Sequence, residues 1–259
     1  MSELKRLKRE YKLEVARKWI YISAFSFLLI IGMILLFLNT VYFHVTNQNH
    51  VEKVLDETKN ISAQQIEGSK DVIEKLYNSE SDITSKDSSK KISHNFDVIN
   101  PVSSMTSDAV FNKDLVIGQL YIPDLERNLP ILEGTSQDNL YNGASTLKPN
   151  QKLGEGNFAL ASLNISEKEY LFSNLNQVQE GHSIYATDKK MIYEYEISKI
   201  SEINEDINQS IGDDESKIIT LVTHNNNDED SHIIIKADFK YSYSFDEATS
   251  ELAQVFLPN

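Results

Sequence analysis

The feature that most limits how this chain can fold is an apolar stretch from Trp19 to Phe43, whose only ionisable groups are the phenols of Tyr21 and Tyr42. A helix of about 20 such residues crosses the roughly 30 Å hydrocarbon core of a bilayer. The stretch is longer than the apolar run of about 7–15 residues in a secretory signal peptide. No small-x-small cleavage site follows it. We therefore predict an uncleaved membrane anchor over residues 19–43.

The charges are unevenly distributed on the two sides of this anchor. The formal net charge is −14, but residues 1–19 carry a net charge of +4, which leaves −18 for the remainder. Lysine and arginine next to a membrane span favour the cytoplasmic side. We therefore expect a cytoplasmic N-terminus and an extracellular remainder. The acidic remainder also argues against nucleic acid as a partner, because phosphate contacts require lysine and arginine.

Four regions follow from composition and pattern. Residues 1–18 form a basic cytoplasmic tail, residues 19–43 the anchor, residues 44–104 an extracellular stalk, and residues 105–259 the folded domain. Apolar residues in the stalk partly follow helical spacing, which predicts one or two short helices. Residues 79–93 are rich in serine, lysine and aspartate, so we expect this part of the stalk to be flexible.

The folded domain has the pattern of a β protein. The segment from Val116 to Pro123 alternates and ends at a proline, as a strand does. Two β-branched runs, Ile218–Thr223 and His232–Lys236, flank a polar loop of seven residues, 225–231, which predicts two strands joined by a loop. Many short, evenly spaced strands favour a small β-barrel. Short helices are expected at Tyr170–Leu175 and Phe245–Phe256.

Two segments carry a resemblance to a known family. The sequence Thr220–Leu221–Val222–Thr223 and the later strand resemble the end of the class A sortase domain, whose pattern is T-L-(V/I)-T-C, a polar loop, and R-I-I-V-K. Residues 157–164, NFALASLN, resemble the family's N-(Y/F)-(A/S)-L-A-(S/G)-H-H. Class A sortases are membrane-bound cysteine transpeptidases of Gram-positive bacteria. The resemblance covers about residues 96–240, including the segment FDVINPVS at 96–103, and implies a closed β-barrel of about eight strands with short helices.

The same resemblance marks the positions that would carry chemistry. His224 stands where the family has its nucleophilic cysteine, Leu163 replaces the catalytic histidine, and His232 replaces the arginine. The chain contains no cysteine, which excludes a thiolate nucleophile. Ser162 matches a serine common in the family pattern, so we interpret it as scaffold. We expect a pseudoenzyme that has a sortase fold, no intact catalytic residue and no cofactor.

An enzymatic alternative remains open. His224 and His232 would project toward one cleft if their strands are neighbours, and they could begin a Zn²⁺ site. Tetrahedral zinc takes three or four ligands, however, and only Asn164, Asp228 and Asp230 could be added. We predict no metal site. The alternative is a divergent hydrolase or transferase that uses His224, His232 or a metal in place of a thiolate.

The resemblance also implies a peptide groove. Ala144 and Ala161 match two small positions against which the sorting peptide lies in the family. The expected function is therefore binding or regulation in the sorting or anchoring of cell-surface proteins. Expected partners are LPxTG-type sorting peptides, surface proteins or an active sortase, together with the membrane through one helix.

Overall fold

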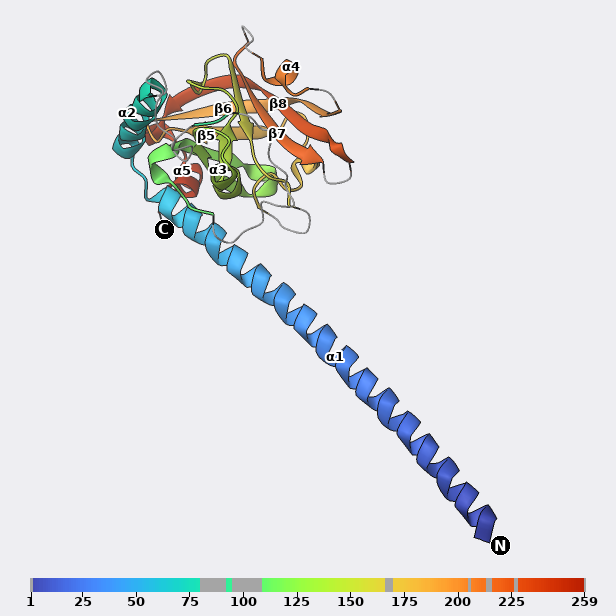
Figure 1. The fold of residues 1–259 in the computed structure, drawn as a ribbon. Helices are drawn as coiled ribbons and strands as arrows, with labels where there is room; N and C mark the ends of the chain where they lie inside the picture. Colours follow the sequence, from blue (N-terminus) through green and yellow to red (C-terminus); the bar gives the residue numbers. More distant parts are fainter. Residues whose placement is uncertain are drawn as a thin grey trace. The chain divides into compact units, whose positions relative to one another are not determined.

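The computed structural model describes residues 2–79, 92–94, 109–165, 170–204, 206–212, 216–225 and 228–258. The chain separates into two compact units, Met1–Asn49 and His50–Asn259. The first belongs to one continuous helix, α1 (Ser2–Lys59), at the blue end of the ribbon in Figure 1. Within it, Tyr11–Leu38 contains an 18-residue window with a mean hydropathy of 2.6 and is long and apolar enough to cross a membrane. The segment 96–103 and most of the stretch 79–93 lie outside the described residues.

The second unit begins with the last turns of α1 and with helix α2 (Ala63–Ser79). A capping box starts α2: the Ser62 hydroxyl accepts from the Gln65 N–H at 3.3 Å, and the Gln65 side chain accepts from the Ser62 N–H at 2.8 Å. Ile66 of α2 packs in a buried cluster with Val116 and Leu132 of the barrel. The predicted stalk helix is thus present, and its apolar face packs on the domain.

Eight strands close into a barrel in the order β1-β2-β3-β4-β7-β8-β6-β5, which confirms the predicted fold class. The strands are β1 (Val116–Ile122), β2 (Arg127–Leu132), β3 (Ala144–Thr146), β4 (Asn157–Ala161), β5 (Ser183–Thr187), β6 (Met191–Ile203), β7 (Ile218–Asn225) and β8 (Asp228–Ser244). The α-helices around them are α3 (Gln137–Asn142), α4 (Asn208–Ile211) and α5 (Ser250–Phe256), and several are marked in Figure 1. The 3-10 helices are η2 (Lys113–Leu115), η3 (Pro123–Leu125), η4 (Leu175–Gln177) and η5 (Phe245–Glu247).

The barrel is filled by large side chains that alternate with outward-facing ones. Tyr195, Phe158 and Phe172 are among its largest fully buried residues. The Tyr195 hydroxyl accepts a hydrogen bond from the Gly154 N–H at 2.9 Å, so its polar atom is not left unsatisfied. Burial raises the pKa of Tyr195 and keeps this hydroxyl neutral.

Strand direction determines which segments meet at each end of the barrel. β4 and β7 are parallel neighbours, with Ala161 beside Val222, and β8 runs antiparallel to β7. The residues after β4, the end of β7 and the start of β8 therefore lie at one end, which we call the carboxyl end. The opposite, amino end holds the starts of β4 and β7 together with the end of β2.

Three local predictions differ from the structure. The predicted seven-residue polar loop is shorter, because Asn225 pairs with Asp228 and extends β7 and β8 into it. Tyr170–Leu175 is a series of turns, not a helix, because Leu171 and Asn174 have left-handed φ values of 53° and 61°. The C-terminal helix is interrupted, and α5 begins only where the Thr249 side chain accepts from the Leu252 N–H.

Candidate functional site

Leu163 follows β4 and lies inside the apolar core at the carboxyl end. Its side chain is 0% exposed, and its carbonyl accepts a hydrogen bond from the Phe172 N–H at 3.0 Å. Tyr170, Leu171 and Phe172 belong to the same buried cluster. An aliphatic side chain in this place carries no proton to donate, and it contributes to the stability of the segment that follows β4.

His224 and His232 lie beside each other at the same end of the barrel. They are directly opposite in the β7–β8 register, and their ring centroids are 4.8 Å apart at an interplanar angle of 40°. Both side chains are half-buried. The Asn164 side chain donates to the His224 carbonyl at 3.0 Å and ties the residues after β4 to the end of β7. The fold therefore gathers the three sequence-predicted positions at one end.

The hydroxyl groups near these positions bind the scaffold. The Ser162 hydroxyl donates to the Gly143 carbonyl at 2.7 Å, and the Thr223 hydroxyl donates to the Ser162 carbonyl at 2.7 Å. Both side chains are 0% exposed. A nucleophilic serine needs an accessible oxygen and an adjacent base. Ser162 has a buried oxygen that donates to a main-chain carbonyl, and this supports its interpretation as scaffold.

Ala144 and Ala161 lie close together, as the groove prediction requires. Ala161 pairs with Ser145, the residue after Ala144, across the β3–β4 ladder. Both alanines are 0% exposed in this conformation, within the same apolar cluster as Leu163. A peptide that contacts them would have to displace the side chains that now cover them.

Glu202 was not identified from the sequence, although it organises the β7–β8 turn. Its carboxylate accepts from the Asn225 side chain at 2.6 Å and from the Ser231 hydroxyl at 3.1 Å. Ile203, the next residue, lies opposite His232 in the register of β6 and β8. The only sequence signal was one acidic residue near the end of an alternating strand, and its partners lie more than twenty positions away.

At this end the structure brings two imidazole rings, those of His224 and His232, into contact. Within the described ranges, no group of three or more histidine, cysteine, aspartate or glutamate residues could hold a metal ion. Imidazole pairs bind transition metals well, but a structural or catalytic zinc site uses at least three protein ligands. The pair of imidazoles by itself supplies fewer ligands than such a site takes.

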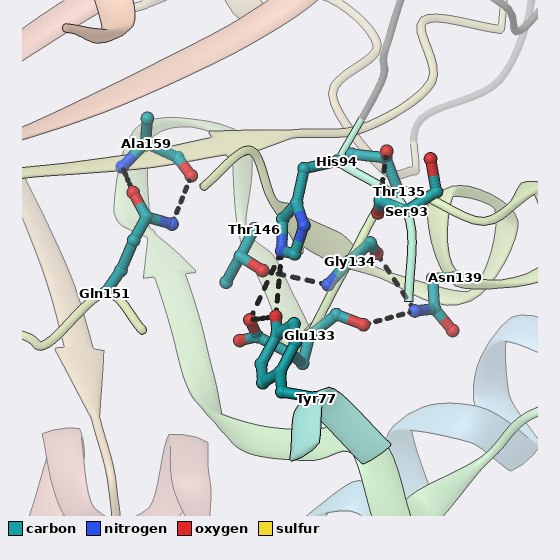
Figure 2. Close-up of polar contacts among 10 residues, drawn as sticks. All are labelled: Tyr77, Ser93, His94, Glu133, Gly134, Thr135, Asn139, Thr146, Gln151 and Ala159. Carbon is teal, nitrogen blue, oxygen red and sulfur yellow. Dashed lines mark hydrogen bonds and ion pairs between the residues drawn. The ribbon is translucent and has the colours of Figure 1, made fainter. Parts of the chain in front are cut away.

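A second polar cluster lies at the amino end of the barrel (Figure 2). Glu133, which follows β2, is 3% exposed and accepts a hydrogen bond from the Tyr77 hydroxyl at 2.5 Å. His94 Nε2 lies 3.3 Å from the same carboxylate oxygen and 3.2 Å from the Tyr77 oxygen. Tyr77 comes from α2 and His94 from the described segment 92–94. The cluster therefore connects the predicted stalk to the barrel.

Segment 92–94 closes tightly over the turn after β2. The Thr135 N–H and hydroxyl both donate to the Ser93 carbonyl, at 2.6 and 3.1 Å (Figure 2). Gly134 has a φ of 82°, and a Cβ there would approach Ile92 Cγ2 to 2.5 Å. Only glycine fits this close passage without displacement. The two sides of this contact are 42 residues apart, so no local sequence pattern indicates it.

A cavity of about 610 Å³ borders this cluster, between α2 and the amino end. Its wall combines apolar and charged side chains, among them Ile73, Tyr77, Glu133, Lys152, Phe158 and Tyr193. The cavity lies at the opposite end from Leu163, His224 and His232. It is therefore separate from the positions that the sequence identified.

The comparisons with known proteins agree with this geometry. The sortase domain family model matches residues 120–240. The chain is 33% identical to sortase A of Streptococcus agalactiae over 66% of this chain and 73% of the relative. It is 37% identical to sortase A of Bacillus anthracis over 48% of this chain, and that match spans 59% of the relative, which is less than two thirds of its length.

Solved structures show the same fold. The Listeria monocytogenes sortase A structure matches with a TM-score of 0.51 at 28% identity, covering 56% of this chain and 99% of that one. Streptococcus pneumoniae sortase C-3 matches with a TM-score of 0.56 at 17% identity, covering 80% of this chain and 98% of that one. The barrel topology, the identity to curated sortases and the family match agree, and the chain belongs to the sortase family.

Proposed function

We propose that this protein is a membrane-anchored sortase-family pseudoenzyme that binds or regulates partners in the sorting or anchoring of cell-surface proteins. One observation carries the proposal: Leu163, His224 and His232 meet at one end of the barrel, in a sequence without cysteine. The proposed topology has a cytoplasmic N-terminus and an extracellular barrel. The proposed partners are LPxTG-type peptides, surface proteins or an active sortase.

The chemistry of the three side chains supports this proposal. Cysteine transpeptidation needs a thiolate to attack a peptide carbonyl and to hold the acyl group for transfer. An imidazole at His224 would form an acyl-imidazole, which hydrolyses readily. Leu163 cannot protonate a leaving amine, a contribution commonly worth about 10²–10⁴-fold. His232 lacks the fixed charge and the planar fork of donors that arginine provides.

The alternative is a hydrolase or transferase that uses the histidine pair. The 4.8 Å separation of the two rings is the observation that favours it, because it places two bases side by side at the carboxyl end of the barrel. Such an enzyme would lose activity with His224→Ala, and its activity would be insensitive to thiol reagents. This outcome differs from every expectation of the pseudoenzyme.

The test uses the full chain in lipid nanodiscs with a quenched-fluorescence LPxTG-type peptide and an amine acceptor. We expect no turnover above that of heat-treated protein. The triple variant Leu163→His, His224→Cys, His232→Arg restores the family residues, and any gain of thiol-dependent cleavage would show that the loss lies in these positions. Unfolding must be followed in parallel, because Leu163 is buried and a histidine there costs stability. Thiol-independent cleavage by the unmodified chain would contradict the proposal.

A further inference from the structure

Four residues form a row across the outer face of the barrel. On β8 the row is at Tyr241, nine residues along the strand from His232. Tyr121 of β1 pairs with Tyr185 of β5, Tyr185 pairs with Glu194 of β6, and Glu194 pairs with Tyr241 of β8. Directly paired residues of neighbouring strands point to the same face of a sheet. The strands β5, β6 and β8 lie side by side in Figure 1. The row therefore places one carboxylate between two tyrosines.

Burial shows that this row faces outward. Leu120, Ile184 and Tyr195, which alternate with the row residues along their strands, are 0% exposed inside the barrel. Tyr241 is 54% exposed, and Tyr121, Tyr185 and Glu194 are half-buried. The tyrosines of this row are partly exposed and lie next to one another, unlike single aromatic residues scattered over a surface. The ring centroids of Tyr121 and Tyr185 are 6.5 Å apart and stacked.

Hydrogen bonds fix the carboxylate in the centre of the row. The Ser183 hydroxyl donates to Glu194 Oε1 at 3.0 Å, and the Tyr241 hydroxyl also hydrogen-bonds this carboxylate. The hydrogen bond to Glu194 raises the pKa of Tyr241 to about 12. Hydroxyl groups orient a carboxylate but do not neutralise it. A carboxylate held between two aromatic rings is placed to meet a cation.

Acidic side chains near the row favour a cationic partner. Among the described residues, no lysine or arginine forms an ion pair with Glu194, and the nearby Lys240 pairs with Glu196 instead. Glu126 and Glu251 lie close enough to Tyr121 to contribute to its raised pKa, after the larger effect of burial. The faces of aromatic rings attract cations as well. The carboxylates and the rings therefore favour the same kind of partner.

We propose that this row is a docking surface for an extended, arginine-bearing segment of a partner protein, with one guanidinium seated on Glu194 between Tyr185 and Tyr241. Arginine fits better than lysine because its planar group stacks on tyrosine and binds a carboxylate through two donors. Four strands about 4.8 Å apart give a row about 14 Å long. This length accommodates about four residues of an extended peptide. The surface is independent of the carboxyl-end positions, so it can operate whether or not those positions bind anything.

The experiment uses the full chain in nanodiscs of zwitterionic lipid, which does not attract basic peptides. The probe is a fluorescent peptide of alternating arginine and serine, and the control probe replaces each arginine with citrulline, which has a similar shape and no charge. Binding is followed by fluorescence anisotropy. We expect binding of the arginine peptide, no comparable binding of the citrulline peptide, and weaker binding as salt increases.

Substitutions locate the site. Glu194→Gln replaces the carboxylate with a neutral amide of the same shape. It should weaken binding roughly tenfold, because it removes the charge-assisted contact. Tyr241→Ala should weaken binding several-fold. Tyr241 is 54% exposed, so its removal leaves the packed core of the barrel intact. Glu155→Gln, an exposed acidic residue at the amino end, is the matched control and should change affinity less than twofold. The proposal is overturned if Glu194→Gln and Tyr241→Ala bind the arginine peptide as tightly as the unmodified chain does. It is also overturned if the citrulline peptide binds as well as the arginine peptide.

Discussion

His224 and His232 face each other across the β7–β8 ladder, in direct register and with ring centroids 4.8 Å apart. In the family pattern these positions belong to a nucleophile and to a donor that binds substrate. Here the two imidazoles contact each other, so the pair can be tested as a structural unit before any question of activity.

A double cysteine variant at these positions should form an internal disulfide. Directly opposite residues of antiparallel strands have Cα atoms about 4.5–5.5 Å apart, within the range of about 4.4–6.8 Å that a disulfide spans. The chain has no other cysteine, so His224→Cys/His232→Cys offers a single possible internal bond. Mild oxidation should remove two hydrogens from the mass and prevent maleimide labelling. The pair His224→Cys/His182→Cys is the control and should stay reduced, because β5, which follows His182, does not pair with β7.

Leu163→Ala should destabilise the barrel strongly. Leu163 is 0% exposed in the apolar core, and removing a buried leucine typically costs about 2–5 kcal/mol of unfolding free energy. Leu257→Ala is the control, since Leu257 is 41% exposed and should cost much less than Leu163→Ala. Denaturant unfolding measures both values. A loss below about 1 kcal/mol for Leu163→Ala would mean that the side chain lies in an open groove.

The sequence predicted the barrel because its strand segments are rich in apolar and β-branched residues and are separated by turn residues, although β6 and β8, with 13 and 17 residues, are longer than the short strands expected. The segments at Val116 and Ile218 became β1 and β7 as expected, and Leu163, His224 and His232 lie at one end as the resemblance implied. These predictions depended on local periodicity and on motif order, which a single sequence displays directly.

The remaining differences depend on partners that are distant in sequence. The polar loop is short because Glu202 of β6 holds Asn225 and Ser231, and no local pattern reveals that contact. Tyr77 likewise meets Glu133 across fifty-six positions. Burial of Ala161 could not be predicted either, because it depends on which side chains cover the strand end. Tertiary contacts of this kind decide loop length and accessibility.

Tyr77→Phe should cost about 1–3 kcal/mol, because it removes a hydroxyl that donates to the buried Glu133 carboxylate at 2.5 Å. The control is Tyr241→Phe, which removes a hydroxyl that also bonds a carboxylate but at an exposed position open to water. That change should stay within about 0.5 kcal/mol. Equal effects of the two substitutions, measured by denaturant unfolding, would show that α2 does not depend on this contact.

Stability should rise with pH between about pH 8 and pH 10 because of Lys189. Burial, and then the nearby charge of Lys59, lower the pKa of Lys189 to about 8 in the folded chain. The unfolded lysine keeps its proton to about pH 10.4, so in this window the unfolded state binds more protons and stability increases with pH. Lys189 is partly open to solvent, so we expect a gain of only about 1 kcal/mol.

Lys189→Met isolates this effect. Tyr170 and Tyr195, whose pKa values are raised by burial, oppose it above about pH 10, but they are present in both chains and cancel in the comparison. The difference in unfolding free energy between the unmodified chain and the variant should therefore grow from pH 8 to pH 10. A difference that is independent of pH would show that Lys189 is not desolvated.

The last prediction concerns whether the carboxyl end can still bind a sorting peptide. His232→Arg restores a guanidinium beside His224, and a charge-assisted hydrogen bond is worth roughly 1.5–3 kcal/mol, or about one to two decades of affinity. We expect weak binding of an LPxTG-type peptide by the unmodified chain, about millimolar to tens of micromolar, and tighter binding by His232→Arg without any cleavage. His182→Arg is the matched control, because it adds the same charge beside β5.

The burial of Ala144 and Ala161 limits peptide affinity, because the peptide must first displace the apolar contacts that cover them. Contact between Leu163 and the apolar side chains of the peptide returns only part of that free energy. In the unmodified chain the missing guanidinium should weaken binding more than the Leu163 contact strengthens it, because a buried peptide carbonyl without a donor costs more than one apolar contact returns. Peptide affinity measured for all three chains decides the matter. If His232→Arg binds no better than His182→Arg, the alanines do not line a peptide groove, and partners must dock on another surface of the barrel.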